Sequence, residues 1–151
     1  MKKLLIVYHS QSGTCARLAG DARQGAIAER EVETHLLRAW DADTAALIAA
    51  QGLLLVAAEN SGALAGGMKD FLDRTFYPVH AQQHVIPYAM LISAGNDGRG
   101  AAQQAARIAS GYPLVAAAEP VILRGDYCAD HAAAAREYGQ ALATGLSMGI
   151  F

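Results

Sequence analysis

Residues Lys3–Cys15, with the sequence KLLIVYHSQSGTC, determine the class of fold that the rest of the chain completes. The first half, Lys3–Tyr8, is a short continuous apolar run, which is typical of a strand buried on both faces. The second half is a polar turn with three hydroxyls and one glycine, and Thr14–Glu29 after it repeats apolar residues at helical spacing. A buried strand that passes through such a turn into a helix predicts a βα unit of a parallel sheet.

The rest of the chain repeats this alternation. Further strands are predicted at Val32–Leu37, Leu53–Ala58, Val85–Ser93 and Leu114–Leu123. Helices are predicted at Thr14–Glu29, Asp41–Gln51, Gly67–Phe76, Gly98–Ser110 and Ala129–Leu146. Five strands alternating with five helices predict an α/β fold, in which a five-stranded parallel sheet has helices on both faces. The length of 151 residues suits one domain, and we assign residues 1–151 to it.

Composition excludes several other classes of protein. The formal charge is −2, and only three lysines are present, which argues against a basic face that binds nucleic acid. No apolar run reaches the roughly 18 residues of a membrane-spanning helix, so we expect a cytoplasmic protein. Two cysteines without metal-ligand spacing form neither a disulfide framework nor a metal site. The 33 alanines indicate that the helices pack closely through small side chains.

Ligands bind such a sheet beyond the carboxyl ends of its strands, so the loops after strands one, three and four are the candidate sites. The first loop, His9–Cys15, offers hydroxyls, backbone N–H groups and the positive end of a helix dipole to an anion. It lacks the lysine of a Walker A loop and two of the three glycines of the dinucleotide fingerprint. A phosphate monoester held by neutral donors is one interpretation, and an ordinary capped helix start is the other.

The segment Tyr8–Ala19 resembles the phosphate loop of flavodoxin-like proteins, whose pattern is Ser-x-Thr-Gly-Asn-Thr. The resemblance implies that the phosphate of FMN is held by Ser10, Gln11, Ser12, Gly13, Thr14 and Cys15. Cys15 stands in the place of the last threonine of the pattern, so one hydroxyl contact is replaced there. We expect its side chain to pack beneath the phosphate rather than to react.

The second loop resembles the flavin loop of NAD(P)H-dependent FMN reductases and quinone reductases of the same fold. Their pattern Pro-Glu-Tyr-x-Gly-Ser, followed by Leu-Lys-Asn-x-Leu-Asp-Arg, corresponds here to Ala58–Ala63 and Met68–Arg74. The resemblance places four residues along the flavin edge, namely Glu59, Asn60, Ser61 and Gly62. An alternative for Glu59 is that it accepts N–H bonds within its own turn. The loop brings no aromatic side chain to the ring.

The third loop resembles the glycine-rich segment that flanks the pyrimidine end of FMN in the same reductases. The candidate contacts to that ring are Ala94, Gly95, Asn96 and Asp97. Asp97 also suits the N-cap of the next helix, and the two roles are compatible. Arg99 is the nearest cation, and its two interpretations are exposure to solvent and contact with the phosphate of a nicotinamide dinucleotide.

Several other residues invite a functional role. His80 and His84 are four residues apart, but no glutamate completes the zincin pattern, so we assign no metal. A flavin or substrate role is one interpretation of Tyr77 or His80, after the third helix, and a purely structural role is the favoured one. Trp40 follows the second strand and is expected to pack in the core or in an interface. The apolar ending 145–151 is expected to dock on the body of the protein or on a second copy in a homodimer.

The resemblance implies the flavodoxin-like strand order 2-1-3-4-5 and FMN as cofactor. The favoured hypothesis is an oxidoreductase that takes hydride from NAD(P)H and passes it through FMN to a small acceptor, a quinone or a flavin. The alternative is a flavodoxin-type one-electron carrier that binds redox proteins, and a fold without cofactor is a third. Carriers tend to be strongly acidic around the ring and to stack it between aromatics. Direct hydride transfer needs no side-chain acid or base, so we assign no catalytic residue.

Overall fold

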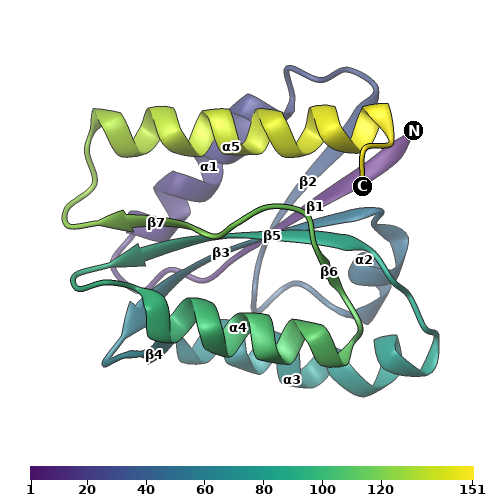
Figure 1. Cartoon of the computed structure of the whole chain (residues 1–151), viewed down its shortest axis with the longest axis horizontal. Coiled ribbons are helices and arrows are strands. Elements are labelled where there is room, and N and C mark those ends of the chain that lie inside the picture. Colours follow the sequence, from purple (N-terminus) through teal and green to yellow (C-terminus); the bar gives the residue numbers. More distant parts are fainter.

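A parallel β-sheet lies between two layers of helices in the computed structural model, which describes residues 1–151 (Figure 1). Its long strands are β1 (Lys2–Tyr8), β2 (Val32–Arg38), β3 (Gly52–Asn60) and β5 (Pro87–Ala94). They stand in the order β2-β1-β3-β5, and the outer side of β5 pairs with both β6 (Val115–Ala116) and β7 (Val121–Arg124). The predicted order 2-1-3-4-5 is confirmed, with β6 and β7 together forming the fifth strand.

The helices divide between the two faces of the sheet. One face is covered by α1 (Thr14–Ala26) and α5 (Ala129–Met148), and the other by α2 (Thr44–Ala49), α3 (Gly66–Ala81) and α4 (Arg99–Gly111). β1 contributes side chains to both cores, because successive side chains of a strand point to opposite faces of the sheet. Leu4 and Ile6 belong to the core under α1 and α5, whereas Leu5 and Val7 belong to the opposite core. None of the helices combines the length and the hydropathy needed to cross a membrane.

The backbones of α1 and α5 are in direct contact. A Cβ built on Gly25 lies 1.9 Å from the carbonyl oxygen of Arg136, and one built on Gly139 lies 2.0 Å from that of Ala22. Ala22 and Ala135 are fully buried in the core beneath the same two helices. The prediction that small side chains bring the helices close together is confirmed for this pair.

The fifth strand is broken, although the sequence predicted one continuous strand over Leu114–Leu123. Pairing with β5 stops after Ala116 and resumes at Val121. Pro120 lies in the break, and it has no N–H to donate to the sheet. A cavity of about 290 Å³ opens between this break and α4, and Tyr88 and Met90 form part of its wall.

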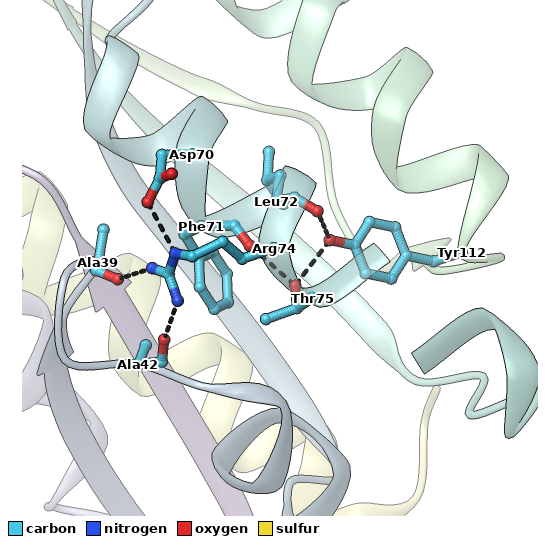
Figure 2. Close-up of polar contacts among 8 residues, drawn as sticks. All are labelled: Ala39, Ala42, Asp70, Phe71, Leu72, Arg74, Thr75 and Tyr112. Carbon is cyan, nitrogen blue, oxygen red and sulfur yellow. Dashed lines mark hydrogen bonds and ion pairs between the residues drawn. The ribbon is translucent and has the colours of Figure 1, made fainter. Parts of the chain in front are cut away.

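Arg74 of α3 fastens the loop after β2 to the helix layer (Figure 2). Its Nε donates to Asp70 at 2.7 Å, its Nη2 to the carbonyl oxygen of Ala39 at 2.6 Å and its Nη1 to that of Ala42 at 3.1 Å. A planar guanidinium can serve three acceptors at once, which a lysine ammonium on a flexible stem does less precisely. The ion pair that Asp70 and Arg74 form therefore also positions a loop at the edge of the sheet.

Tyr112, after α4, joins α4 to α3 through a buried hydroxyl (Figure 2). Its OH donates to the carbonyl oxygen of Leu72 and lies 2.8 Å from the hydroxyl of Thr75. Thr75 in turn donates to the carbonyl oxygen of Phe71 at 2.9 Å. Burial raises the pKa of Tyr112 to about 12, so its hydroxyl keeps its proton at neutral pH.

Replacing Arg74 with alanine is expected to lower the free energy of unfolding by about 1.5 kcal/mol, because two backbone carbonyls lose their charged donor. The matched control is Lys69→Ala. Lys69 bonds only to Asp73, at 2.7 Å on the exposed side of the same helix, and its loss is expected to cost less than about 0.5 kcal/mol. Urea unfolding followed by circular dichroism measures both values, and equal losses would show that the two carbonyl contacts contribute nothing.

Candidate functional site

The three predicted binding segments meet at one edge of the sheet. The strands that precede them, β1, β3 and β5, are parallel and adjacent, so their carboxyl ends lie side by side (Figure 1). The N–H of His9, at the start of the first loop, donates to the carbonyl oxygen of Val56 in β3 at 3.1 Å. A ligand that contacted all three segments would therefore lie at this edge.

The first loop leaves the start of α1 open to an anion. Gly13 is the N-cap residue with φ of 103°, a value that glycine adopts without strain, and its N–H donates to the Ser10 hydroxyl at 3.0 Å. No side chain caps α1, and its first turn contains no acidic residue, so the positive end of the dipole is not neutralised. The ordinary capped helix start, which the sequence left open, is not what the structure has. Gln11 and Ser12 are exposed, and Thr14 is half-buried.

Cys15 is buried at the start of α1 and belongs to the core beneath α1 and α5. Burial raises the pKa of its thiol to about 11, because a thiolate there would lose its hydration. The side chain therefore packs beneath the loop, as expected, and it is not an activated nucleophile.

Iodoacetamide at pH 8 is expected to alkylate Cys128 at least about 50-fold faster than Cys15, because the raised pKa of Cys15 leaves little thiolate and burial blocks access. Cys128 lies exposed at the start of α5 and serves as the internal reference. Mass spectrometry of the two tryptic peptides over time measures the ratio. Comparable rates at the two cysteines would contradict the buried position of Cys15.

The second segment is a β-hairpin rather than an irregular loop. β3 continues to Asn60 and pairs with the short antiparallel strand β4 (Ala63–Leu64). Ser61 and Gly62 between them have φ of 51° and 76°, and two successive positive φ values are the mark of a type I′ hairpin turn. The sequence prediction ended this strand at Ala58, because the polar residues that follow gave no sign of a paired strand.

The carboxylate of Glu59 bonds to the neighbouring segment and not within its own turn. Its Oε1 accepts the N–H of Gly98 at 3.3 Å, and its Oε2 accepts that of Ala101 at 3.2 Å. The alternative that Glu59 serves its own turn is therefore wrong. The carboxylate joins the hairpin to the start of α4.

Asp97 and Arg99 pair with each other at the third loop. Asp97 accepts the backbone N–H of Arg99 at 3.1 Å, and its Oδ2 lies 2.9 Å from the Arg99 guanidinium. These hydrogen bonds hold the pKa of Asp97 below its ordinary value, so the carboxylate stays charged. Arg99 is exposed, as one of its two interpretations expected, but it is engaged by Asp97.

A polar cleft of about 680 Å³ lies between the second and third segments. Its lining consists of Glu59, Gly62, Gly95, Asn96, Asp97, Gly100 and Arg124. A Cβ built on Gly62 or Gly95 would meet no atom within 4 Å, so a flat ligand has access to the backbone at both positions. The cleft thus brings together five of the predicted site residues, whereas Ser10–Cys15 lie at the same edge without lining it. Ala94 is buried at the end of β5, and Asn60 and Ser61 are exposed at the turn.

Besides Gly100 of α4, the lining residue that sequence reasoning missed is Arg124. It is the last residue of β7, and its exposed side chain makes no hydrogen bond or ion pair within the protein. The sequence assigned candidate sites only to the loops after strands one, three and four. The position of Arg124 at the carboxyl end of the fifth strand was the available clue.

The loop after β7 is held against α1. The Tyr127 hydroxyl donates to Asp21 at 2.6 Å, and Arg136 of α5 donates to the other oxygen of the same buried carboxylate at 3.1 Å. The Arg17 guanidinium lies 3.9 Å from the centre of the Tyr127 ring. Arg17, in the first turn of α1 after the first loop, is thereby held on an aromatic face.

The interpretation that gave Tyr77 or His80 a flavin or substrate role is wrong. α3 begins at the carboxyl edge of the sheet, and its 16 residues carry it to the opposite edge, because a helix rises about 1.5 Å per residue. Tyr77 is exposed there, and His80 lies 3.2 Å from the carbonyl oxygens of Gly111 and Tyr112. The sequence prediction ended this helix too early, at Phe76.

The predictions for Trp40 and for the chain ending have different outcomes. Trp40 is 57% exposed and stands edge-on to the His9 ring, so a place in the core is wrong, and packing in an interface stays a prediction. The ending docks on the body of the protein, where Phe151 contacts Gly145 and lines a small apolar cavity with Leu142. No group of histidine, cysteine or acidic residues is arranged to hold a metal ion.

The amino-acid sequence matches no protein-family model and no curated protein. The structure is similar to a flavodoxin from the domain Archaea, with a TM-score of 0.78, 17% identity, and coverage of 95% of this chain and 98% of that one. It is similar to a WrbA-like flavodoxin protein from Agrobacterium tumefaciens, with a TM-score of 0.79, 18% identity, and coverage of 98% and 99%.

A third similar structure is the rubredoxin oxygen:oxidoreductase of Desulfovibrio gigas, with a TM-score of 0.82 and 13% identity. The match covers 99% of this chain but 37% of that one, so the same architecture forms one part of a longer protein there. Identities at this level establish architecture and leave function to the residues of the site. The chain has the flavodoxin-like fold.

Proposed function

We propose that this chain binds FMN and transfers electrons as a flavodoxin-type carrier. One observation carries the proposal: two features lie at the same edge of the sheet. One is the uncapped start of α1 behind Ser10–Thr14, and the other is the polar cleft between Glu59 and Asp97. Two of the similar structures described above are a flavodoxin and a WrbA-like flavodoxin protein. The likeness to the flavodoxin favours a carrier over the reductase that the sequence favoured, whereas the likeness to the WrbA-like protein favours a reductase.

The residues present fit FMN in two respects. A phosphate monoester suits the α1 start, where hydroxyl groups and the dipole are available and no internal carboxylate competes. A flat ring suits the cleft, because Gly62 and Gly95 leave their backbone open to close approach. The cleft volume of about 680 Å³ also lies in the range of small-molecule sites.

The protein's own groups would bind and orient the cofactor rather than act as acids or bases. Bound FMN supplies the capacity to accept and release electrons one at a time or in pairs. Ser10, Ser12 and Thr14 hold the phosphate end by neutral donors, and the backbone around Gly62 and Gly95 holds the ring end. Arg124, the unpaired cation of the cleft, contributes positive charge next to any ligand there.

A second candidate is an NAD(P)H-dependent reductase of a quinone or a flavin. The observation that favours it is that acidic side chains after two of the strands are paired, Asp97 of the cleft with Arg99 and Asp41 after β2 with Arg38. A carrier that attracts basic proteins needs free negative charge at that surface. The absence of an aromatic side chain from both ring segments also leaves room for a nicotinamide.

An anaerobic reductive titration of the FMN-loaded protein separates the two candidates. The carrier is expected to show two resolved one-electron steps in the visible spectrum with dithionite, and no bleaching within minutes by NADH or NADPH. Rapid bleaching by either nicotinamide, followed by reoxidation with a quinone, would establish the reductase instead. Free FMN under the same conditions is the control.

A further inference from the structure

Glu59 caps a helix that begins almost forty residues further along the chain. The N-cap of α4 is Gly98, which has no side chain to offer. Glu59 fills this role from the end of β3, with one carboxylate oxygen on the N–H of Gly98 and the other on that of Ala101. A carboxylate at a helix N-terminus is stabilised both by these hydrogen bonds and by the dipole.

Two further contacts fasten the same hairpin to the same helix. A Cβ built on Gly100 would lie 2.1 Å from the carbonyl oxygen of Gly62, so the turn rests directly on the first turn of α4. The N–H of Leu64 in β4 donates to the Gln104 side chain at 2.8 Å. The hairpin therefore contacts α4 at three of its own residues: Glu59 in the first strand, Gly62 in the turn and Leu64 in the second strand.

The bonds of Glu59 also make the start of α4 a poor site for an external anion. Asp97 accepts the N–H of Arg99, so two carboxylates already neutralise the positive end of α4. The start of α1 has no such carboxylate. An external anion is therefore directed to α1, and the groups that face each other across the cleft are the hairpin and the loop Gly95–Asp97.

We infer that Glu59 is a positioning residue, which sets the separation of the two cleft walls and affects a bound ring only through them. The identity of the ring as the isoalloxazine of FMN rests on the proposed function. The resemblance places Glu59 along the flavin edge, where backbone N–H groups can reach the ring, and its carboxylate oxygens bond to the start of α4. In this inference the Glu59 side chain acts by holding the hairpin against α4.

The test compares Glu59→Gln with Glu137→Gln, a substitution at an exposed position of α5. Amide hydrogen exchange measured by NMR, without any cofactor, is expected to become at least about tenfold faster at Gly98 and Ala101 in Glu59→Gln alone. Riboflavin and FMN, followed by flavin fluorescence, are each expected to bind about tenfold more weakly. Inorganic phosphate, followed by NMR shifts of the first loop, is expected to bind as in the unchanged protein.

Gly100→Ala tests the same contact from the other side. Alanine favours a helix over glycine, but its Cβ must displace the Gly62 carbonyl, so ring affinity is expected to fall while phosphate affinity stays the same. This variant decides the matter if Glu59→Gln does not fold.

Unchanged exchange at Gly98 and Ala101 in Glu59→Gln would overturn the inference. Weaker flavin binding with unchanged exchange would also overturn it, by showing that Glu59 touches the ring directly. An equal loss of phosphate affinity would reveal general unfolding and would contradict a positioning role. Failure of the unchanged protein to bind FMN would refute the proposed function, whereas the exchange measurement would still decide whether Glu59 holds the hairpin.

Discussion

Replacing Gly139 with alanine is expected to lower the free energy of unfolding by about 3 kcal/mol, because the added methyl group overlaps a backbone oxygen. A Cβ at this position lies 2.0 Å from the carbonyl oxygen of Ala22, and backbone atoms cannot rotate away as a side chain can. Relief of the overlap requires α5 to move away from α1, which also loosens the core that both helices cover. Chemical unfolding followed by circular dichroism measures the loss.

Gly20→Ala is the matched control for this effect. Gly20 lies inside α1, and a Cβ built there would meet no atom within 4 Å. The substitution is expected to stabilise the protein by about 0.5 kcal/mol, because alanine is the better helix former. Equal effects of the two substitutions would show that α1 and α5 are not in backbone contact.

Replacing Thr14 with aspartate is expected to weaken FMN binding by about 100-fold, because the new carboxylate repels the phosphate at the same helix start. The same carboxylate interacts favourably with the helix dipole and is expected to raise the free energy of unfolding by about 0.5 kcal/mol. The two changes have opposite signs, so lower affinity cannot be attributed to a damaged fold. Fluorescence titration measures the affinity and urea unfolding measures the stability.

Two comparisons locate the effect of Thr14→Asp at the phosphate. Riboflavin has the ring but no phosphate, and its affinity is expected to change less than about twofold. Thr44→Asp makes the same substitution at the first residue of α2 and is expected to leave FMN affinity unchanged. Equal weakening by Thr14→Asp and Thr44→Asp would contradict a phosphate site at α1.

The parallel sheet could be predicted from the alternation of elements and from apolar runs such as Leu4–Val7, whereas its strand order came from the resemblance. The hydrophobic effect acts on such runs whatever their neighbours are, and all four residues are buried. The break in the fifth strand and the length of α3 could not be predicted in this way. The break depends on where Pro120 lies relative to β5, and the length of α3 depends on contacts near its C-terminal end, such as that of His80 with the carbonyl oxygen of Tyr112.

The same distinction, between features set by local sequence and features set by distant contacts, applies to the candidate site. Gly13 and Ser10 were recognisable because a turn between a buried strand and a helix has local sequence requirements. The partners of Glu59 lie 39 and 42 residues away, and no local pattern indicates a bond between them. Arg124 and Trp40 reach the loop edge because parallel strands end together, so their places follow from the topology rather than from their own segments.

The most direct test of the account is whether the purified protein holds FMN. The protein is incubated with excess FMN, passed through a gel-filtration column, and its visible spectrum is recorded against its protein concentration. About one FMN is expected to be retained per chain, with a shifted flavin spectrum and quenched fluorescence, and Thr14→Asp is expected to bind FMN about 100-fold more weakly. A protein peak without flavin absorbance would contradict the account.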